Sequence, residues 1–126
     1  MLKYLIFMFL LFTTLNANHI NWYGDYDKAH QKALKEDKSL MVLLIQKDSK
    51  ESKRVLKDIF INQAYIDKIN KEYISVIVTY NQKQSYPIEM LYTDIFPALF
   101  FLDKYELFIY EPFRGDITKE MMESLK

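Results

Sequence analysis

Ser49 and Ser52 are two serines three residues apart, in a local sequence that would suit a reactive pair of side chains. They follow the continuously apolar run 40–45 and begin a segment with helical spacing, residues 49–60. A Cys-x-x-Cys pair in that setting would perform thiol–disulfide exchange, which needs an attacking thiolate and a second, resolving sulfur. The chain contains no cysteine. Dithiol chemistry, disulfides and zinc–thiolate sites are therefore excluded.

Helix capping accounts for these serines without any catalysis. A helix N-terminus leaves backbone N–H groups unpaired, and Asp48 or Ser49 can accept from them, a contribution of roughly 1 kcal/mol. The alternative is a serine nucleophile, which needs a general base. His19 and His30 are the two histidines, and neither is expected near the serines. We therefore expect no catalytic residue, with Ser49 and Ser52 as degenerate redox positions.

The same two histidines are poor metal ligands. His19 and His30 lie eleven positions apart, whereas a ligand pair on one helix needs a spacing of three or four. The alternative is that both side chains are solvated. The chain also has only two glycines, which argues against a glycine-rich phosphate loop. We expect neither a metal nor a cofactor.

The composition describes one folded domain without a strongly charged partner. Half of the 126 residues are hydrophobic, which is ample for a packed core. The chain has 17 basic and 17 acidic residues, giving a formal net charge of zero. This balance does not support attraction of the whole domain to nucleic acid or to an anionic membrane.

Residues 1–17 have the pattern of a signal peptide. Lys3 supplies a positive charge, residues 4–12 are apolar, and Ala17 is a small residue suited to cleavage. The apolar run is shorter than the roughly 20 residues that span a bilayer. We expect a periplasmic or secreted domain of residues 18–126. The alternative is an uncleaved N-terminal anchor, which would be the sole contact with a membrane.

The hydrophobic spacing predicts alternating helices and strands. The expected elements are helices at 25–37, 49–60, 62–73 and 116–125, and strands at 39–45, 74–80, 98–102 and 107–110. A strand–helix–strand unit implies a parallel pair with a right-handed crossover, and the closing hairpin adds antiparallel strands. The prediction is an α/β fold in which a central mixed β-sheet is flanked by helices.

The order of several markers resembles the thioredoxin-like superfamily, in particular its secreted or periplasmic members. The markers are Trp22, the stretch from Ala33 through Leu40, the strand Met41–Ile45, Ser49–Lys53, Ile74–Thr79, Phe96–Ala98, Asp103 and Gly115. The resemblance covers essentially the whole chain after the signal segment. It implies a thioredoxin-like fold in which Ser49–Lys53 occupy the active-site turn and Pro97 occupies the cis-proline position.

Departures from the family pattern bear on function. The two active cysteines of the family fall on Ser49 and Ser52, and the buried acid of thioredoxin falls on Leu43. The resemblance therefore implies a non-catalytic protein- or peptide-binding module of the chaperone or scaffold kind. The alternative is a thiol–disulfide oxidoreductase whose two cysteines were replaced by serine in this form. The drift of the rest of the motif favours natural loss.

The loop before Pro97 is the expected binding surface. In relatives this loop lies beside the active-site turn and pairs its backbone with an extended peptide, a form of strand addition that needs no sulfur. We expect Phe96, Pro97 and Tyr92 to contact a protein or an extended peptide. The alternative is a fold-defining turn that has lost its ligand. The chain carries no signal of an oligomeric state.

Overall fold

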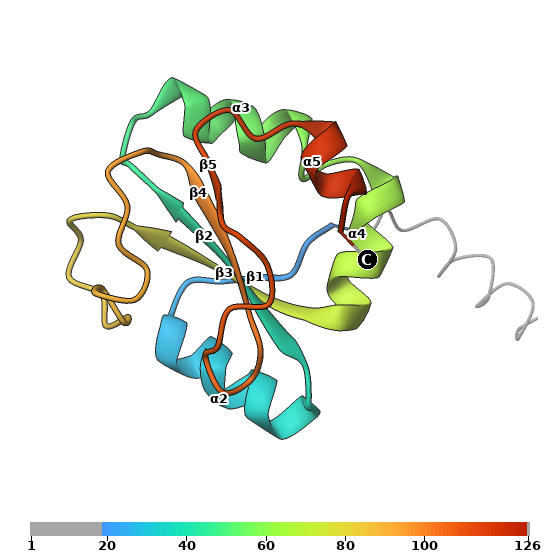
Figure 1. The fold of residues 1–126 in the computed structure, drawn as a ribbon, viewed down its shortest axis with the longest axis vertical. Helices are drawn as coiled ribbons and strands as arrows, with labels where there is room; N and C mark the ends of the chain where they lie inside the picture. Colours follow the sequence, from blue (N-terminus) through green and yellow to red (C-terminus); the bar gives the residue numbers. More distant parts are fainter. Residues whose placement is uncertain (1–18, 126) are drawn as a thin grey trace, which may run out of the picture.

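The computed structural model describes residues 19–125, so the predicted signal peptide lies outside the described residues. In this part of the chain a five-stranded sheet has the strand order β1-β3-β2-β4-β5 (Figure 1). The strands are β1 (Trp22–Tyr23), β2 (Ser39–Ile45), β3 (Tyr73–Thr79), β4 (Ala98–Leu102) and β5 (Phe113–Arg114). The helices are α2 (Tyr26–Glu36), α3 (Lys50–Asp58), α4 (Gln63–Glu72) and α5 (Lys119–Glu123).

The sheet is mixed, as the sequence predicts. β2 and β3 are parallel, in register from Ser39↔Tyr73 to Ile45↔Thr79. β4 is antiparallel to β2, with Leu44 opposite Ala98. The parallel pair requires a crossover, which α3 and α4 provide. The prediction of a central mixed sheet with flanking helices is therefore confirmed.

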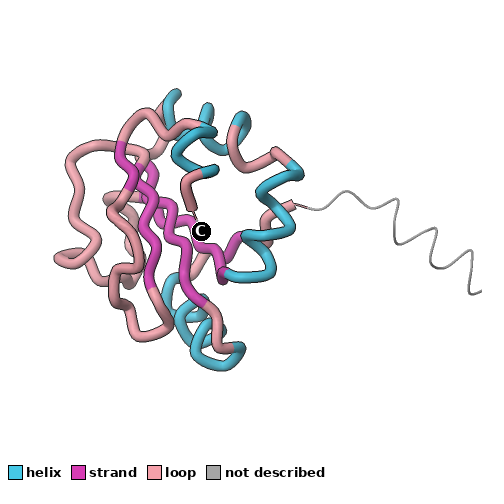
Figure 2. The backbone as a smooth tube through the Cα atoms, turned by 45° about the vertical axis from the view of Figure 1, so that its right-hand side comes forward, coloured by secondary structure: helices cyan, strands magenta, loops and turns pink. Residues whose placement is uncertain are grey.

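Helices cover both faces of the sheet. Successive side chains of a strand point to opposite faces, so alternate residues of β2 enter two separate cores. Met41 and Leu43 pack with residues of α3, α4 and α5. Leu40 and Val42 pack instead with residues of α2. Figures 1 and 2 show α2 on the opposite side of the sheet from the other three helices.

Polar side chains at the N-termini cap the helices. Asp25 accepts from the Lys28 backbone N–H at 3.0 Å, Asn62 accepts from Ala64, and Thr118 accepts from Met121. Of the two candidates before α3, Ser49 is the cap and Asp48 is not. Within residues 19–125, no helix is both long and apolar enough to cross a bilayer.

The predicted returning strand at 107–110 is wrong. This segment makes an isolated bridge, Leu102↔Phe108, and the strand that pairs with β4 is β5, Phe113–Arg114. The Asp103 carboxylate accepts from two backbone N–H groups of the following turn, which gives the tight reversal. Phe113 packs edge-on against Phe101, at 5.7 Å between ring centroids. Regular pairing with β4 therefore resumes at Phe113, later than the hydrophobic pattern indicated.

Candidate functional site

The turn after β2 positions the two serines at the carboxyl end of that strand. The chain leaves β2 at Ile45, and Asp48 adopts a left-handed backbone with φ of 63°. The Ser49 N–H donates to the Gln46 carbonyl at 3.3 Å, which closes the turn. α3 then begins at Lys50, directly behind Ser49.

Ser49 and Ser52 have different environments. The Ser49 hydroxyl accepts from the Ser52 backbone N–H at 3.2 Å, so the predicted capping role is confirmed for Ser49. Ser52 is 2% exposed, and its hydroxyl has no hydrogen-bond partner in the described part of the chain. An unsatisfied buried hydroxyl costs about 1–3 kcal/mol, so Ser52 is not a neutral replacement for an apolar residue.

No histidine is placed to activate either serine. His30 Nε2 lies 2.8 Å from the Lys104 carbonyl oxygen, and Lys104 lies beyond β4. β4 is antiparallel to β2, so this contact is at the end of the sheet away from Ser49. His19 is exposed and its carbonyl accepts from Asn70. The sequence-based alternative of two solvated histidines is wrong for His30, which is half-buried against the turn after β4.

The Pro97 loop is held by short-range hydrogen bonds. The Thr93 hydroxyl donates to the Ile95 carbonyl at 2.8 Å and accepts from the Ile95 N–H at 3.1 Å. The Phe96–Pro97 peptide bond is cis, and the Pro97 carbonyl accepts from Gly115 at 2.8 Å. Pro97 is buried, whereas Phe96 is half-buried.

The serine turn and the Pro97 loop lie at the same end of the sheet. Leu44 pairs with Ala98, so the register brings Pro97 beside the last residues of β2. The Phe96 ring packs against Tyr80, which follows β3, with ring centroids 5.0 Å apart. Figure 1 shows the orange segment before β4 reaching the end of the sheet where α3 begins. Tyr92, the third predicted contact residue, is 66% exposed in this loop.

Sequence reasoning missed a pocket at this end of the sheet. The pocket has a volume of about 390 Å³ and lies between the end of β2, the first turn of α3 and the loop after β3. Its wall includes Lys47, Asp48, Ser52, Lys53, Thr79 and Gln84. The signal was available, because side chains that follow neighbouring parallel strands meet at the carboxyl edge of a sheet.

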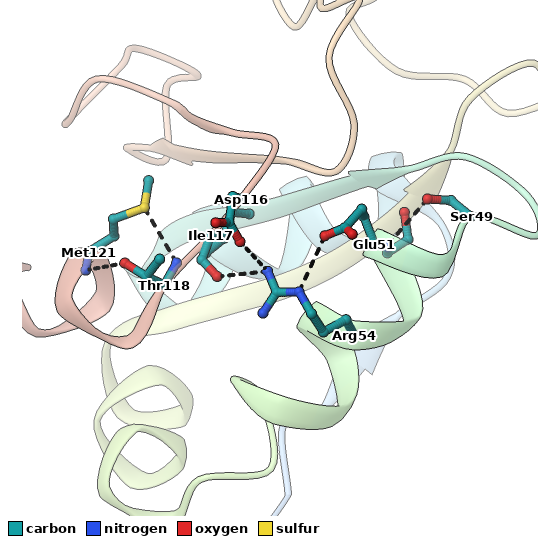
Figure 3. Close-up of polar contacts among 8 residues, drawn as sticks. Ser49, Glu51, Arg54, Asp116, Ile117, Thr118 and Met121 are labelled. Atoms are coloured by element: carbon teal, nitrogen blue, oxygen red, sulfur yellow. Dashed lines mark hydrogen bonds and ion pairs between the residues drawn. The ribbon is translucent and has the colours of Figure 1, made fainter.

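Arg54 was also missed, and it fixes α3 against the segment that precedes α5. Its guanidinium donates to Glu51 at 3.2 Å and to Asp116 at 2.8 Å, and its Nη2 reaches the Ile117 carbonyl at 3.2 Å (Figure 3). Glu51 and Arg54 are one helical turn apart, whereas Asp116 is distant in sequence. The arginine thus keeps the Glu51 carboxylate occupied on the side of α3 that faces Asp116.

At this end of the sheet the Tyr86 phenol is held in its protonated form, and the described residues form no metal-binding cluster. Burial raises the pKa of the Tyr86 phenol, and the neighbouring Tyr80 raises it further, so Tyr86 remains a hydrogen-bond donor at neutral pH. Residues 19–125 contain no group of three or more His, Asp or Glu side chains that could hold a metal ion. Chemically, this end of the sheet offers hydroxyl groups, backbone groups, ammonium groups and aromatic rings.

Comparison with known proteins gives matches among solved structures. No family model matches the chain, and no curated protein matches it. A solution structure from Bacteroides thetaiotaomicron, described as a "putative disulphide-isomerase", is 19% identical with a TM-score of 0.71, over 86% of this chain and 91% of that one. A DsbH oxidoreductase is 18% identical with a TM-score of 0.62, over 79% and 78%. With its mixed five-strand sheet and flanking helices, the chain therefore has a thioredoxin-like fold.

Proposed function

We propose that this chain is a non-catalytic module that binds an extended segment of another protein beside Phe96. The observation that carries the proposal is the backbone of Phe96. Neither its N–H nor its C=O has a hydrogen-bond partner within residues 19–125, whereas the neighbouring Ile95 and Pro97 are both paired. Unpaired backbone groups next to a strand can pair with an added strand.

Exposed apolar side chains surround these backbone groups. Tyr92 is 66% exposed, Ile95 is 52% exposed, and the Phe96 ring is half-buried against Tyr80. Aromatic side chains at an interface supply large contact areas at a small cost in conformational entropy. Backbone pairing would provide the geometry, and Phe96 with Tyr92 would provide most of the affinity.

The absence of cysteine means that this binding is not followed by thiol exchange. A module of this kind acts as a chaperone or a scaffold, holding a protein or an extended peptide without changing its covalent structure. The signal-like pattern of residues 1–17 supports a periplasmic or secreted location. In that location unfolded, newly exported chains are natural partners.

The test compares an aromatic residue of the Pro97 loop with an exposed aromatic residue at the other end of the sheet. A reduced and carboxymethylated, permanently unfolded protein serves as the probe, and its affinity is measured by fluorescence anisotropy. Phe96→Ala should weaken binding by about 1–2 kcal/mol, a typical interface truncation, which is roughly 5- to 30-fold. Tyr105 is 67% exposed in the turn after β4, so Tyr105→Ala is the control and should leave the affinity unchanged.

Thermal melts of the variants show whether folding is intact. A chain that does not bind the unfolded probe, or one that binds it equally well with and without the Phe96 ring, would contradict the proposal. In either case the loop before Pro97 would be a fold-defining turn without a ligand.

A second candidate is an oxidoreductase whose two cysteines are serine in this form. The observation in its favour is that the two solved structures named above carry isomerase and oxidoreductase names. Leu43 weighs against it, because this buried core position holds an apolar leucine where thioredoxin has an acid. The double variant Ser49→Cys with Ser52→Cys should form a disulfide and gain disulfide reductase activity if this candidate is right. An oxidised but inactive double variant would count against it.

A further inference from the structure

We propose that the pocket beside the start of α3 binds a small ligand that carries a phosphate or carboxylate group. The pocket of about 390 Å³ is at the lower end of the size range of small-molecule sites, roughly 300–1,000 Å³. The site is separate from the Phe96 surface, and the proposal does not depend on peptide binding there.

Two backbone N–H groups at the start of α3 are unpaired, and their residues lie in sequence between the pocket-wall residues Ser49 and Ser52. The Ser52 N–H is capped by Ser49, and the Lys53 N–H donates to the Ser49 carbonyl at 3.2 Å. The N–H groups of Lys50 and Glu51 have no partner in the part of the chain that the structure describes. Unpaired N–H groups and the helix dipole both favour an anion at a helix N-terminus.

The Ser52 hydroxyl is the second, independent sign of a ligand. Ser52 is a residue of the pocket wall and is 2% exposed, and its hydroxyl lacks any hydrogen-bond partner within residues 19–125. Buried polar groups in folded proteins are nearly always paired. A phosphate or carboxylate oxygen at the inner end of the pocket would accept a hydrogen bond from this hydroxyl.

The charges around the pocket favour an anion over a cation. Lys47 and Lys53 belong to the wall, and neither forms an ion pair within the described residues. Glu51, on the same helical turn, is held by Arg54 at 3.2 Å. Asp48 is the one acid in the wall and opposes the two lysines. The net charge of the wall is therefore positive, and the Asp48 carboxylate limits the affinity.

Charge variants test the proposal in both directions. Inorganic phosphate and succinate are titrated separately into the purified chain, with binding followed by amide chemical shifts. The double variant Lys47→Met with Lys53→Met should weaken binding by about tenfold, because charge-assisted hydrogen bonds are the stronger ones. Lys57→Met is the matched control on the same helix and should change nothing. Asp48→Asn should tighten binding, and asparagine tolerates the left-handed backbone at this position.

Ser52→Ala tests the buried hydroxyl separately. It should weaken binding roughly 2- to 10-fold, the equivalent of one hydrogen bond. Binding of phosphate alone would identify a phosphate-bearing ligand, and binding of succinate alone would identify a carboxylate-bearing one. Saturation by neither probe at millimolar concentration, or equal affinity of the chain, the lysine double variant and Ser52→Ala, would overturn the proposal. Phe96→Ala should leave the affinity unchanged, so this site and the peptide surface succeed or fail independently.

Discussion

The two ends of the β-sheet differ in whether their polar groups have hydrogen-bond partners. At the hairpin end, residues 102–107 meet α2 and the turn that follows it. There Tyr26 donates to Glu106 at 2.8 Å, His30 pairs with the Lys104 carbonyl at 2.8 Å, and Lys104 pairs with Asp37 at 2.7 Å. At the loop end, residues 45–53, 79–84 and 92–97, the Ser52 hydroxyl and the Phe96 backbone remain unpaired within residues 19–125.

This difference separates polar groups that stabilise the fold from polar groups that are free to bind another molecule. At the hairpin end, burial and the hydrogen bond to Glu106 raise the pKa of Tyr26, so its phenol stays protonated as a donor. Every hydrogen bond named there joins α2 or the turn behind it to the turn after β4. At the loop end, by contrast, the unpaired Ser52 hydroxyl and Phe96 backbone groups make no hydrogen bond that would stabilise the isolated chain. Polar groups that a fold leaves unpaired on a rigid scaffold are candidates for binding.

The largest difference in stability should come from replacing one tyrosine at each end by alanine. Tyr26 is almost fully buried, so Tyr26→Ala should lower the free energy of unfolding by about 3–5 kcal/mol, the usual cost of removing a buried aromatic ring. Tyr92 at the loop end is exposed, so Tyr92→Ala should change it by about 0.5 kcal/mol or less. Urea unfolding midpoints measure both variants. Equal destabilisation would remove the distinction between the two ends.

A smaller effect, of opposite sign, should distinguish the two serines of the loop end. Ser49→Ala removes the cap of α3 and should cost about 1 kcal/mol. Ser52→Ala removes a buried hydroxyl that has no partner, and should leave stability unchanged or raise it by up to about 1 kcal/mol. Alanine's higher helix propensity acts in the same direction at position 52. A loss of more than 1 kcal/mol at Ser52 would mean that its hydroxyl is paired within the folded chain.

The fold was predictable because local signals and the order of elements agree. Continuous apolar runs indicate the buried strands β2 and β3, and Asp25, Ser49, Asn62 and Thr118 mark the helix starts that the structure contains. The 107–110 segment shows where such signals fail. Its apolar residues have strand-like character, but Leu107, Phe108 and Ile109 are exposed side chains beside a turn. Hydrophobicity alone does not distinguish an exposed loop from a buried strand.

The candidate site was predictable only in part. The positions of Ser49 and Pro97 follow from their places after β2 and before β4. Pairing within the site does not follow, because Arg54 reaches Asp116 across 62 positions of sequence and no spacing rule connects them. The unpaired state of Ser52 is likewise a property of packing, since the sequence shows a serine in a first helical turn, where a hydroxyl commonly finds a partner.

The smallest effect concerns the exposed ion pair of the hairpin end. The hydrogen bond from Lys104, and then its charge, hold the pKa of Asp37 below its usual 3.8. A carboxyl whose pKa is lower in the folded state stabilises the fold above its unfolded pKa, and this contribution is lost as the pH falls through the folded value. Asp37→Asn should therefore be slightly less stable than the original chain at pH 7, and the gap should close below about pH 4. The substitution keeps the left-handed backbone of Asp37, which asparagine tolerates.

Lys104→Met should show the same closing gap in stability. Combining the two changes should add no further pH dependence, because each of them removes the same ion pair. Thermal melts between pH 2 and pH 7 measure all three variants, and a gap that stays constant with pH would show that Lys104 does not act on Asp37 in solution.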